Sequence, residues 1–409
     1  MTNMTNTTNM TNTNELKEMK AKIESLAVFA AIRENPAVAA LHRLLQEMTV
    51  AAYSDFAGKL YPQGADLSSH IRRLLIEDDN FYVRAKASGK TIDDAIEQTV
   101  DHELGILEEI AAIKSDDIHR AINESGFCPV LPEWTNSPVN LRDDFREKMA
   151  NIHSRGYGMF ATHTFFRVSE GKLIPVSHPD HSHLDKFFEY QRERDLIIRN
   201  TEALLSGGGS NMLLYGDMGT GKSSTIKAVA ADFAHRGLRL VEVKKNQLFM
   251  IPDIMEQLAD NPLKFILFID DLSFSGNDDN FSALKATLEG SISGCGSNTL
   301  IYATSNRRHL VRESASDRIA GAGMDEDLHI NDTLQETMSL SARFGLTITF
   351  SKPDKEEYLS IVKSLAEEYG LDVTDEEELF RRAEAFAIRK NGRSPRTARQ
   401  FIELQKIGI

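Results

Sequence analysis

The sequence is short of cysteine and of long apolar runs, and each shortage excludes a class of protein. Among 409 residues there are only two cysteines, Cys128 and Cys295, which lie far apart and form no CxxC pair. This argues against a disulfide scaffold or a zinc site and fits a reducing compartment. No apolar run approaches the roughly 20 residues that span a bilayer. The first residues also lack the basic and apolar zones of a signal peptide, so we expect a cytoplasmic protein with no membrane partner.

The chain also lacks a surplus of basic residues. Its 47 Lys and Arg residues are outnumbered by 61 Asp and Glu residues, which gives a formal net charge of −14. We therefore do not expect it to wrap nucleic acid, although a local basic surface remains compatible with this charge. The length predicts about two or three domains.

The residue pattern divides the chain into five segments. Residues 1–14 repeat Met-Thr-Asn, have almost nothing to bury and should be disordered. Residues 15–156 have helical periodicity and should form a helical N-terminal domain. Residues 157–183 have the pattern of a hairpin followed by a polar connector. Residues 184–350 alternate strands and helices, as a parallel sheet covered on both faces requires, and residues 351–409 are helical again.

Local capping signals predict where several helices begin. Asn35-Pro36 and Ser394-Pro395 each combine a capping side chain with proline at the first helical position. Asn140, Thr91 and Thr374 are further expected caps, the last of them paired with Glu377 in a capping box.

A complete phosphate-binding loop directly follows the apolar run Met212–Tyr215. Its glycines let successive backbone N–H groups point at phosphate oxygens, and the helix that follows adds its N-terminal dipole. Lys222 supplies a mobile charge for the β- and γ-phosphates, and the Ser223 hydroxyl can ligate Mg²⁺. We predict that the loop binds ATP through Gly216, Asp217, Met218, Gly219, Thr220, Gly221, Lys222, Ser223 and Ser224.

Two later strands end in polar side chains. The apolar run Phe265–Ile269 is followed by Asp270 and Asp271. At the carboxyl edge of a parallel sheet Asp270 suits Mg²⁺ binding through water, and Asp271 suits polarising an attacking water. Leu300–Ala303 is followed by Thr304-Ser305-Asn306, and Asn306 can orient water or touch the γ-phosphate. An asparagine that ends a strand is by itself a turn residue. The evidence for a role of Asn306 is that it follows the phosphate loop and the Asp270-Asp271 pair in the chain.

In order and content these motifs resemble an AAA+ ATPase. The stretches FILFIDDLSF, IYATSNRRHLVRE and GRSPRTARQF are similar to a bacterial AAA+ family catalogued only as a domain of unknown function. The resemblance covers roughly residues 184–409 and, more loosely, 140–183. It implies an α/β fold: an AAA+ P-loop NTPase core with a parallel sheet and a C-terminal helical lid, here preceded by a mainly α-helical N-terminal domain.

The resemblance also implies roles for arginines outside the loop. Arg343 matches the arginine finger, which acts on the γ-phosphate of a neighbouring subunit, and this implies a ring-like homo-oligomer. Arg396 matches sensor 2 of the lid, with Arg393 as a close competitor. Arg307 and Arg308 can also face a neighbouring subunit.

We therefore expect an enzyme that hydrolyses ATP to ADP and phosphate with Mg²⁺ and remodels or loads a macromolecular client, either protein or nucleic acid. Lys222, Asp271, Asn306 and Arg343 would be catalytic, and Ser223 and Asp270 would bind the metal.

Two departures from the AAA+ pattern keep other functions open. Asp271 stands where many AAA+ proteins have glutamate, and residues 244–250 lack the glycine of a polypeptide-threading pore loop. The alternatives are a nucleotide-gated switch, similar to a helicase loader, with little turnover, and a P-loop kinase of a small substrate.

Overall fold

The computed structural model describes residues 13–123, 130–180, 183–184, 189–272, 279–288, 298–306, 342–390 and 392–408. Most of the expected disordered tail, both cysteines, and the arginines at 307 and 308 lie outside these residues. The chain divides into two compact units, Met1–Thr162 and His163–Ile409, which are described separately below.

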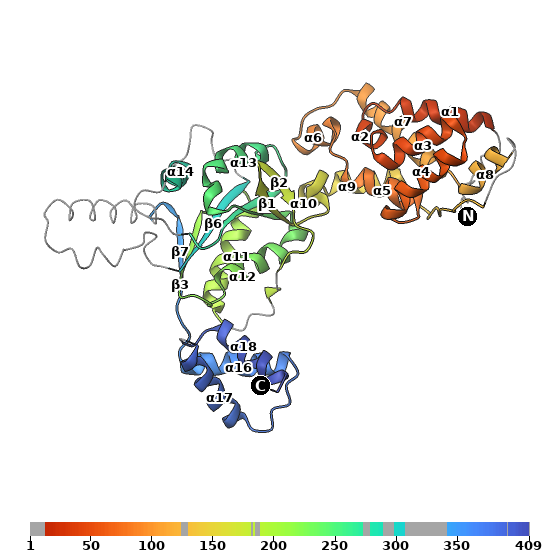
Figure 1. The fold of residues 1–409 in the computed structure, drawn as a ribbon. Coiled ribbons are helices and arrows are strands. Elements are labelled where there is room, and N and C mark those ends of the chain that lie inside the picture. Colours follow the sequence, from red (N-terminus) through yellow and green to blue (C-terminus); the bar gives the residue numbers. More distant parts are fainter. Residues whose placement is uncertain are drawn as a thin grey trace, which may run out of the picture. The chain divides into compact units, whose positions relative to one another are not determined.

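The first unit is helical (Figure 1). Its helices are α1 (Thr13–Glu24), α2 (Ala30–Arg33), α3 (Pro36–Glu47), α4 (Val50–Leu60), α5 (Leu67–Glu77), α6 (Phe81–Ala87), α7 (Asp94–Ala111), α8 (Ser115–Asn123), α9 (Leu141–Ala150) and α10 (Ile152–Arg155). One apolar core runs through these helices, and it includes the buried side chains of Phe29, Leu41, Phe56, Leu107 and Trp134.

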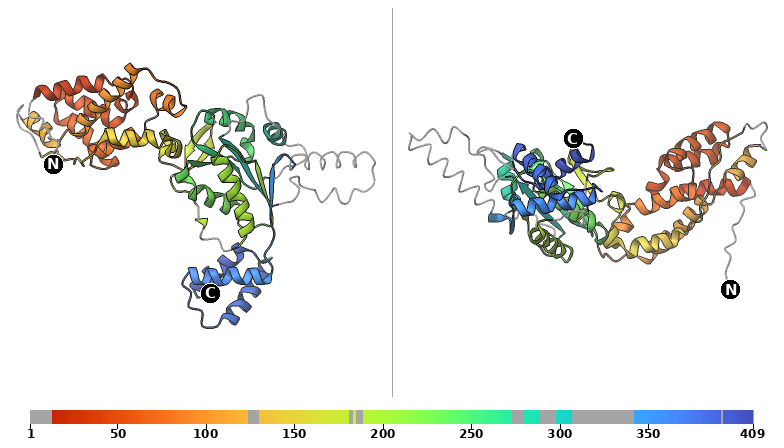
Figure 2. Two further views of the ribbon diagram at one scale, coloured as in Figure 1. Left: turned by 180° about the vertical axis from the view of Figure 1, so that it is seen from behind. Right: turned by 90° about the horizontal axis from the view of Figure 1, so that it is seen from below.

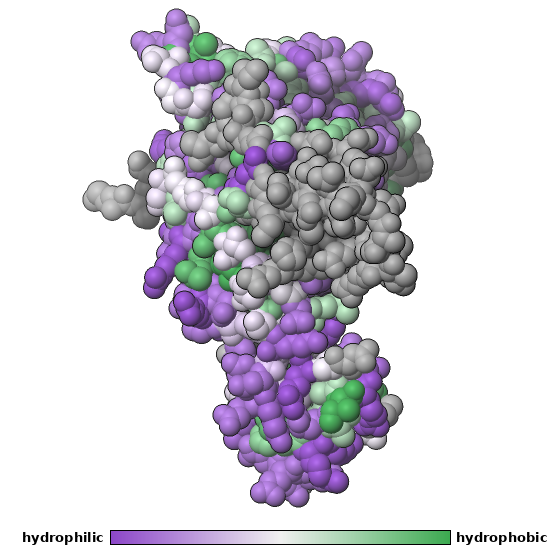
Figure 3. All heavy atoms as spheres, turned by 90° about the vertical axis from the view of Figure 1, so that its left-hand side faces the viewer, coloured by the Kyte–Doolittle hydropathy of each residue, from purple (hydrophilic) through white to green (hydrophobic). Residues whose placement is uncertain are grey.

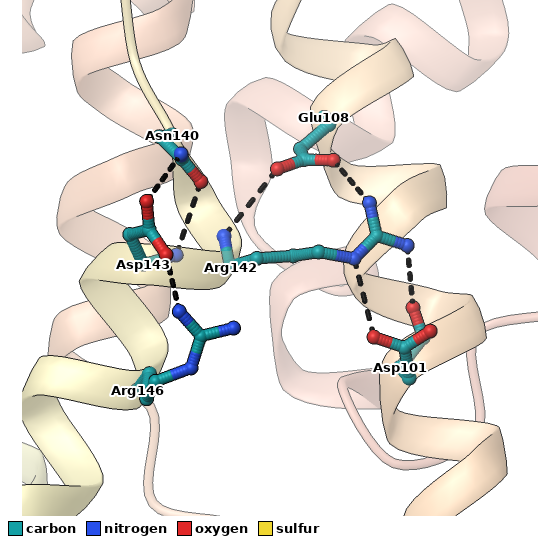
Figure 4. A network of polar contacts seen from close by, with 6 residues as sticks. All are labelled: Asp101, Glu108, Asn140, Arg142, Asp143 and Arg146. Carbon is teal, nitrogen blue, oxygen red and sulfur yellow. Dashed lines mark hydrogen bonds and ion pairs between the residues drawn. The ribbon is translucent and has the colours of Figure 1, made fainter.

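A polar network ties α9 to α7 (Figure 4). The Arg142 guanidinium donates to Glu108 Oε2 over 2.6 Å and to Asp101 Oδ1 over 3.2 Å. A Cβ atom on Gly105 would lie 2.9 Å from Arg142 Nη2, so the glycine leaves room for the arginine to cross α7. Asn140 caps α9 by accepting from the Asp143 amide.

The second unit is built on a seven-stranded sheet in the order β2-β1-β4-β5-β6-β3-β7. Its strands are β1 (Phe165–Ser169), β2 (Lys172–Pro175), β3 (Met212–Gly216), β4 (Leu238–Glu242), β5 (Lys264–Ile269), β6 (Thr299–Ser305) and β7 (Leu346–Phe350). Among the strands of the described residues, only β1 and β2 pair antiparallel, and every other pairing is parallel. The hairpin, which the sequence analysis places with the connector outside the 184–350 core, thus forms two strands of the core sheet.

Helices cover both faces of this sheet. They are α11 (Gln191–Leu205), α12 (Lys222–Asp232), α13 (Ile251–Leu258) and α14 (Asp279–Leu288). Apolar side chains of α11 and α12 pack on one strand face in a single core. The crossovers β3–α12–β4 and β4–α13–β5 run in opposite directions across the sheet. Because such crossovers are right-handed, α13 lies on the other face, as Figure 1 shows.

The chain ends in three helices, α16 (Lys355–Glu368), α17 (Glu376–Arg389) and α18 (Pro395–Lys406), which we call the lid. They share a small apolar core, and the left-hand view of Figure 2 shows them as a separate cluster. On the face drawn in Figure 3 the lid, at the bottom, is mostly hydrophilic. The fold thus agrees with the expected α/β class: a mostly parallel sheet covered by helices, a C-terminal helical lid and a mainly helical N-terminal part.

Helix starts agree with the expected caps in three cases and differ in two. Asn35, Asn140 and Ser394 each accept a hydrogen bond from the first turn of their helix. Thr91 and Thr374 do not cap; Asp93 and Asp375 do so instead. Both errors have one cause, because an aspartate close by supplies a stronger, charged acceptor to the orphan amides.

Candidate nucleotide site

The phosphate loop is closed by β7. Gly216 ends β3 with φ +140°, and a Cβ atom there would lie 2.0 Å from the Phe350 carbonyl oxygen. That same oxygen accepts from the Asp217 amide over 3.2 Å. Gly219 and Gly221 also have positive φ, which only glycine adopts without strain. The glycine spacing is therefore required by the close approach of β7 and by the turn that starts α12.

Lys222 lies at the first position of α12 and is nearly buried. Its Nζ atom donates to the carbonyl oxygens of Gly216 (3.0 Å) and Asp217 (2.7 Å), and to Asn306 Oδ1 (3.1 Å). Burial lowers the pKa of the Lys222 ammonium, and nearby carboxylates oppose this shift. The ammonium is thus held at the mouth of the loop by oxygen acceptors that a phosphate oxygen can replace.

A hydroxyl and a carboxylate meet beside the loop. Ser223 Oγ donates to Asp270 Oδ1 over 2.6 Å, and Thr304 Oγ1 donates to the same oxygen over 2.6 Å. Oxygen donors of this kind are the ligands that Mg²⁺ prefers. Within the described residues, no group of three or more His, Cys, Asp and Glu side chains is arranged to hold a metal. The donors thus fit Mg²⁺, provided that phosphate oxygens and water supply the other ligands.

Asp271 has a left-handed backbone, with φ +51°, which is uncommon for a residue other than glycine. Its amide donates to Thr304 Oγ1 (3.0 Å) and to Asp270 Oδ1 (3.1 Å). Its carboxylate accepts from Asn306 Nδ2 over 2.8 Å. Asn306 therefore contacts both Lys222 and Asp271, because β6 lies between β3 and β5 in the sheet. Strained conformations of this kind cluster at functional sites.

These side chains line one cavity of about 560 Å³, within the roughly 300–1,000 Å³ usual for ligand sites. Its lining residues are Glu189, Tyr190, Met218–Thr225, Asp270, Asp271, Thr304, Asn306, and from the lid Ile361, Leu365, Pro395, Arg396, Arg399, Gln400 and Glu403. Of the expected site residues, Gly216 and Asp217 shape the loop without lining the cavity.

The lid distinguishes the two candidate sensor arginines. Arg396 lines the cavity, and its amide donates to the Gly219 carbonyl over 3.3 Å. Arg393 instead forms a two-point ion pair with Glu384, at 2.8 and 2.9 Å, and lowers the pKa of that carboxyl. Of these two candidates, Arg396 is therefore the one in position to meet a nucleotide in this cavity.

Arg343 does not line the cavity of its own chain. It precedes β7, whose first residue pairs with Met212, whereas the phosphate loop follows the other end of β3. At about 3.3 Å per residue, the paired strands separate the two ends by roughly 13 Å. A Cβ atom on Gly345 would lie 2.8 Å from Ser210 Cβ, which confirms that this segment lies beside the start of β3.

Three further contributions to the site were missed by the motif-based predictions. Thr304 had no signal beyond its place two residues before Asn306. Tyr190 donates from its hydroxyl to the Ser351 carbonyl over 2.6 Å and packs against Phe350, which depends on the tertiary fold. Arg399 follows Arg396 on the same face of α18, a spacing that could have been noticed.

Two solved structures are similar to parts of this chain. A Thermotoga maritima RuvB Holliday junction branch migration motor is 18% identical, with a TM-score of 0.35, covering 55% of this chain and 66% of that one. A chain of an E. coli HORMA:CdnC:Trip13 complex is 15% identical, with a TM-score of 0.36, covering 54% of this chain and 89% of that one. Both TM-scores are low, and we infer neither fold nor function from these likenesses. This chain thus spans just under two thirds of the RuvB chain.

No curated protein matches the sequence. None of the described helices is both long and apolar enough to cross a bilayer. One family model does match, over residues 160–407, which is most of the chain and includes the whole site. The chain therefore belongs to the family described as "Protein of unknown function (DUF815)".

Proposed function

We propose that the protein is an ATPase that hydrolyses ATP to ADP and phosphate with Mg²⁺. One observation carries this proposal: a phosphate loop, a hydroxyl–carboxylate pair and a second carboxylate bonded to an asparagine all line a single cavity. Triphosphate binding needs only the loop. The two carboxylates with separate partners add the groups needed for metal binding and for activating water.

Each side chain has a distinct task in this proposal. Lys222 and the loop amides bind the phosphate oxygens, and Ser223 with Asp270 holds Mg²⁺. The metal, when bound, neutralises charge on the phosphates. Asp271 accepts a hydrogen bond from the attacking water, while the Asn306 amide fixes the direction of that carboxylate. Arg396 of the lid, whose amide donates to the Gly219 carbonyl of the loop, would contact the phosphates.

The site would be completed by a neighbouring subunit. Arg343 lies at the edge of the sheet away from its own loop, so a role at a γ-phosphate requires a second copy of the chain. We therefore propose a homo-oligomer in which Arg343 stabilises charge that develops during phosphoryl transfer in the adjacent site.

ATP turnover would serve to remodel or load a macromolecular client. A nucleotide-gated switch with little turnover is a second candidate, because Asp271 is one methylene shorter than glutamate and Asn306 already holds its carboxylate. Steady-state ATPase rates with and without DNA or candidate proteins separate the two. Stimulation by a client favours remodelling, and an unchanged slow rate favours the switch.

The site assignment is tested with Lys222→Ala. Hydrogen bonds to charged groups contribute roughly 1.5–3 kcal/mol, so ATP affinity should fall at least about tenfold. Lys227→Ala, on the same helix but outside the cavity, is the matched control and should bind as the unaltered protein does. Calorimetric titration with ATP measures both. Undiminished affinity in Lys222→Ala would overturn the assignment.

A further inference from the structure

One hydroxyl contacts both residues of the Asp270-Asp271 pair. Thr304 lies on β6 and is 2% exposed. Its Oγ1 donates to Asp270 Oδ1 over 2.6 Å and accepts from the Asp271 amide over 3.0 Å. A threonine hydroxyl has one hydrogen and two acceptor positions, so both bonds form at once. The Thr304 side chain therefore links the carboxylate of one residue to the backbone of the next.

The backbone of Thr304 holds the same turn. Its carbonyl accepts from the Leu272 amide over 2.7 Å, so two successive amides, those of Asp271 and Leu272, are bonded to one residue. Between them the chain takes the left-handed conformation at Asp271. Such a conformation persists only where surrounding contacts require it. Thr304 supplies two of these contacts and so helps to hold the backbone that carries the Asp271 carboxylate, whose direction Asn306 fixes.

Among the donors to Asp270, Thr304 differs from Ser223 in its burial. Asp270 Oδ1 accepts from Ser223 Oγ, Thr304 Oγ1 and the Asp271 amide. Ser223 lies in the first turn of α12, is partly exposed and lines the cavity, so a ligand bound there can reach its hydroxyl. The Thr304 hydroxyl is buried on a central strand and touches no other carboxylate, so it holds Asp270 in place whatever Ser223 binds.

We propose that Thr304 is a positioning residue that aligns Asp270 and Asp271 for Mg²⁺-bound ATP. In this role Thr304 does not touch the phosphates. It acts by aiming the Asp270 carboxylate at the metal and the Asp271 carboxylate at the water. The proposal rests on the proposed ATPase function.

Thr304→Val tests the proposal because it keeps the shape and removes the hydroxyl. Loss of a bond to a metal-site carboxylate typically lowers activity or metal affinity roughly 10- to 100-fold. We expect turnover to fall by that factor. Affinity for a non-hydrolysable ATP analogue in EDTA should not change, whereas the gain in affinity on adding Mg²⁺ should shrink. Thr304→Ser keeps the hydroxyl and should recover most of both losses.

Thr201→Val is the matched control. Thr201 is fully buried on α11, and its hydroxyl bonds Ile197 O at 2.8 Å and Tyr302 Oη at 3.0 Å, outside the cavity. The Thr201→Val variant should have a lower melting temperature, but the gain in affinity for the ATP analogue on adding Mg²⁺ should not change.

Two results would overturn the role of Thr304. Unaltered turnover and Mg²⁺ dependence in Thr304→Val would do so, and so would a Thr304→Ser variant as impaired as Thr304→Val, which would show a packing role only. If the unaltered protein binds the analogue but releases no phosphate, hydrolysis fails as the proposed function. A reduced Mg²⁺ gain in Thr304→Val would then still support the alignment of Asp270.

Discussion

At the scale of single residues, Asp271 combines a backbone conformation and a charge that can be separated by mutation. Asparagine tolerates the left-handed region and keeps an oxygen for Asn306, but it has no charge. Alanine lacks the polar side chain and is strained there.

We predict that Asp271→Asn retains stability and ATP binding but loses turnover. Asp271→Ala should lose turnover and also lower the free energy of unfolding by about 1 kcal/mol, because left-handed backbone costs that much for an ordinary side chain. Chemical denaturation and phosphate-release assays measure the two effects. Hydrolysis at the unaltered rate by Asp271→Asn would exclude the carboxylate as the group that activates water.

Arg393 and Arg396 show the limit of motif matching at this scale. Both lie in one short basic stretch, and the sequence favoured Arg396, in the first turn of the expected helix, but left Arg393 as a close competitor. The choice depends on Glu384 in α17, which binds Arg393, and on the contact of Arg396 with the loop. Neither contact is encoded locally, because the partners come from other elements.

At the scale of elements, the end of β7 determines the shape of the phosphate loop. Phe350 lies against Gly216 so closely that no side chain fits between them. The loop is therefore a product of two strands that are far apart in sequence.

We predict that Gly216→Ala abolishes ATP binding and lowers the free energy of unfolding of the second unit by about 2–4 kcal/mol, since it combines backbone strain with overpacking. Gly208→Ala is the control. Its Cβ would lie 3.6 Å from the nearest atom, the Ala203 carbonyl oxygen, and its φ is not positive. Thermal unfolding monitored with and without ATP distinguishes them. Equal stability of the two variants would contradict the role given to β7.

The core strands were predictable because each is a short apolar run bounded by turn residues. The strands expected from the apolar runs 212–215, 265–269 and 300–303 all form, within two residues at each end. Which strands lie next to each other was harder to predict from the sequence. For example, β1 pairs with β4, which lies more than seventy residues further along the chain. The hydrophobic periodicity of a strand carries no information about such a partner. Caps were misjudged only where an aspartate competed with a threonine.

At the scale of the whole molecule, the position of Arg343 makes the proposed site depend on a second chain. Lys222→Ala disables a subunit's own loop, and Arg343→Ala disables the contribution to a neighbour. Each variant alone should have little turnover.

We predict that mixing the two variants restores part of the ATPase activity. In mixed oligomers some sites combine an intact loop with an intact Arg343 from the adjacent subunit. The restored activity is measured as phosphate release at a series of mixing ratios. We expect a maximum near equal amounts of the two variants. A mixture no more active than its components would show that Arg343 acts within its own chain or has a structural role.

The contacts at the end of β7 have one more consequence. Phe350 bonds the loop, Ser351 accepts from Tyr190, and Lys352 pairs with Asp217 at 3.7 Å, immediately before the lid begins. A change in lid orientation that moves these three residues must alter bonds at the start of the phosphate loop. Lid orientation and phosphate affinity are then thermodynamically linked, and linkage is reciprocal. A partner that binds the lid in one orientation would change ATP affinity by the same factor by which ATP changes the affinity for that partner.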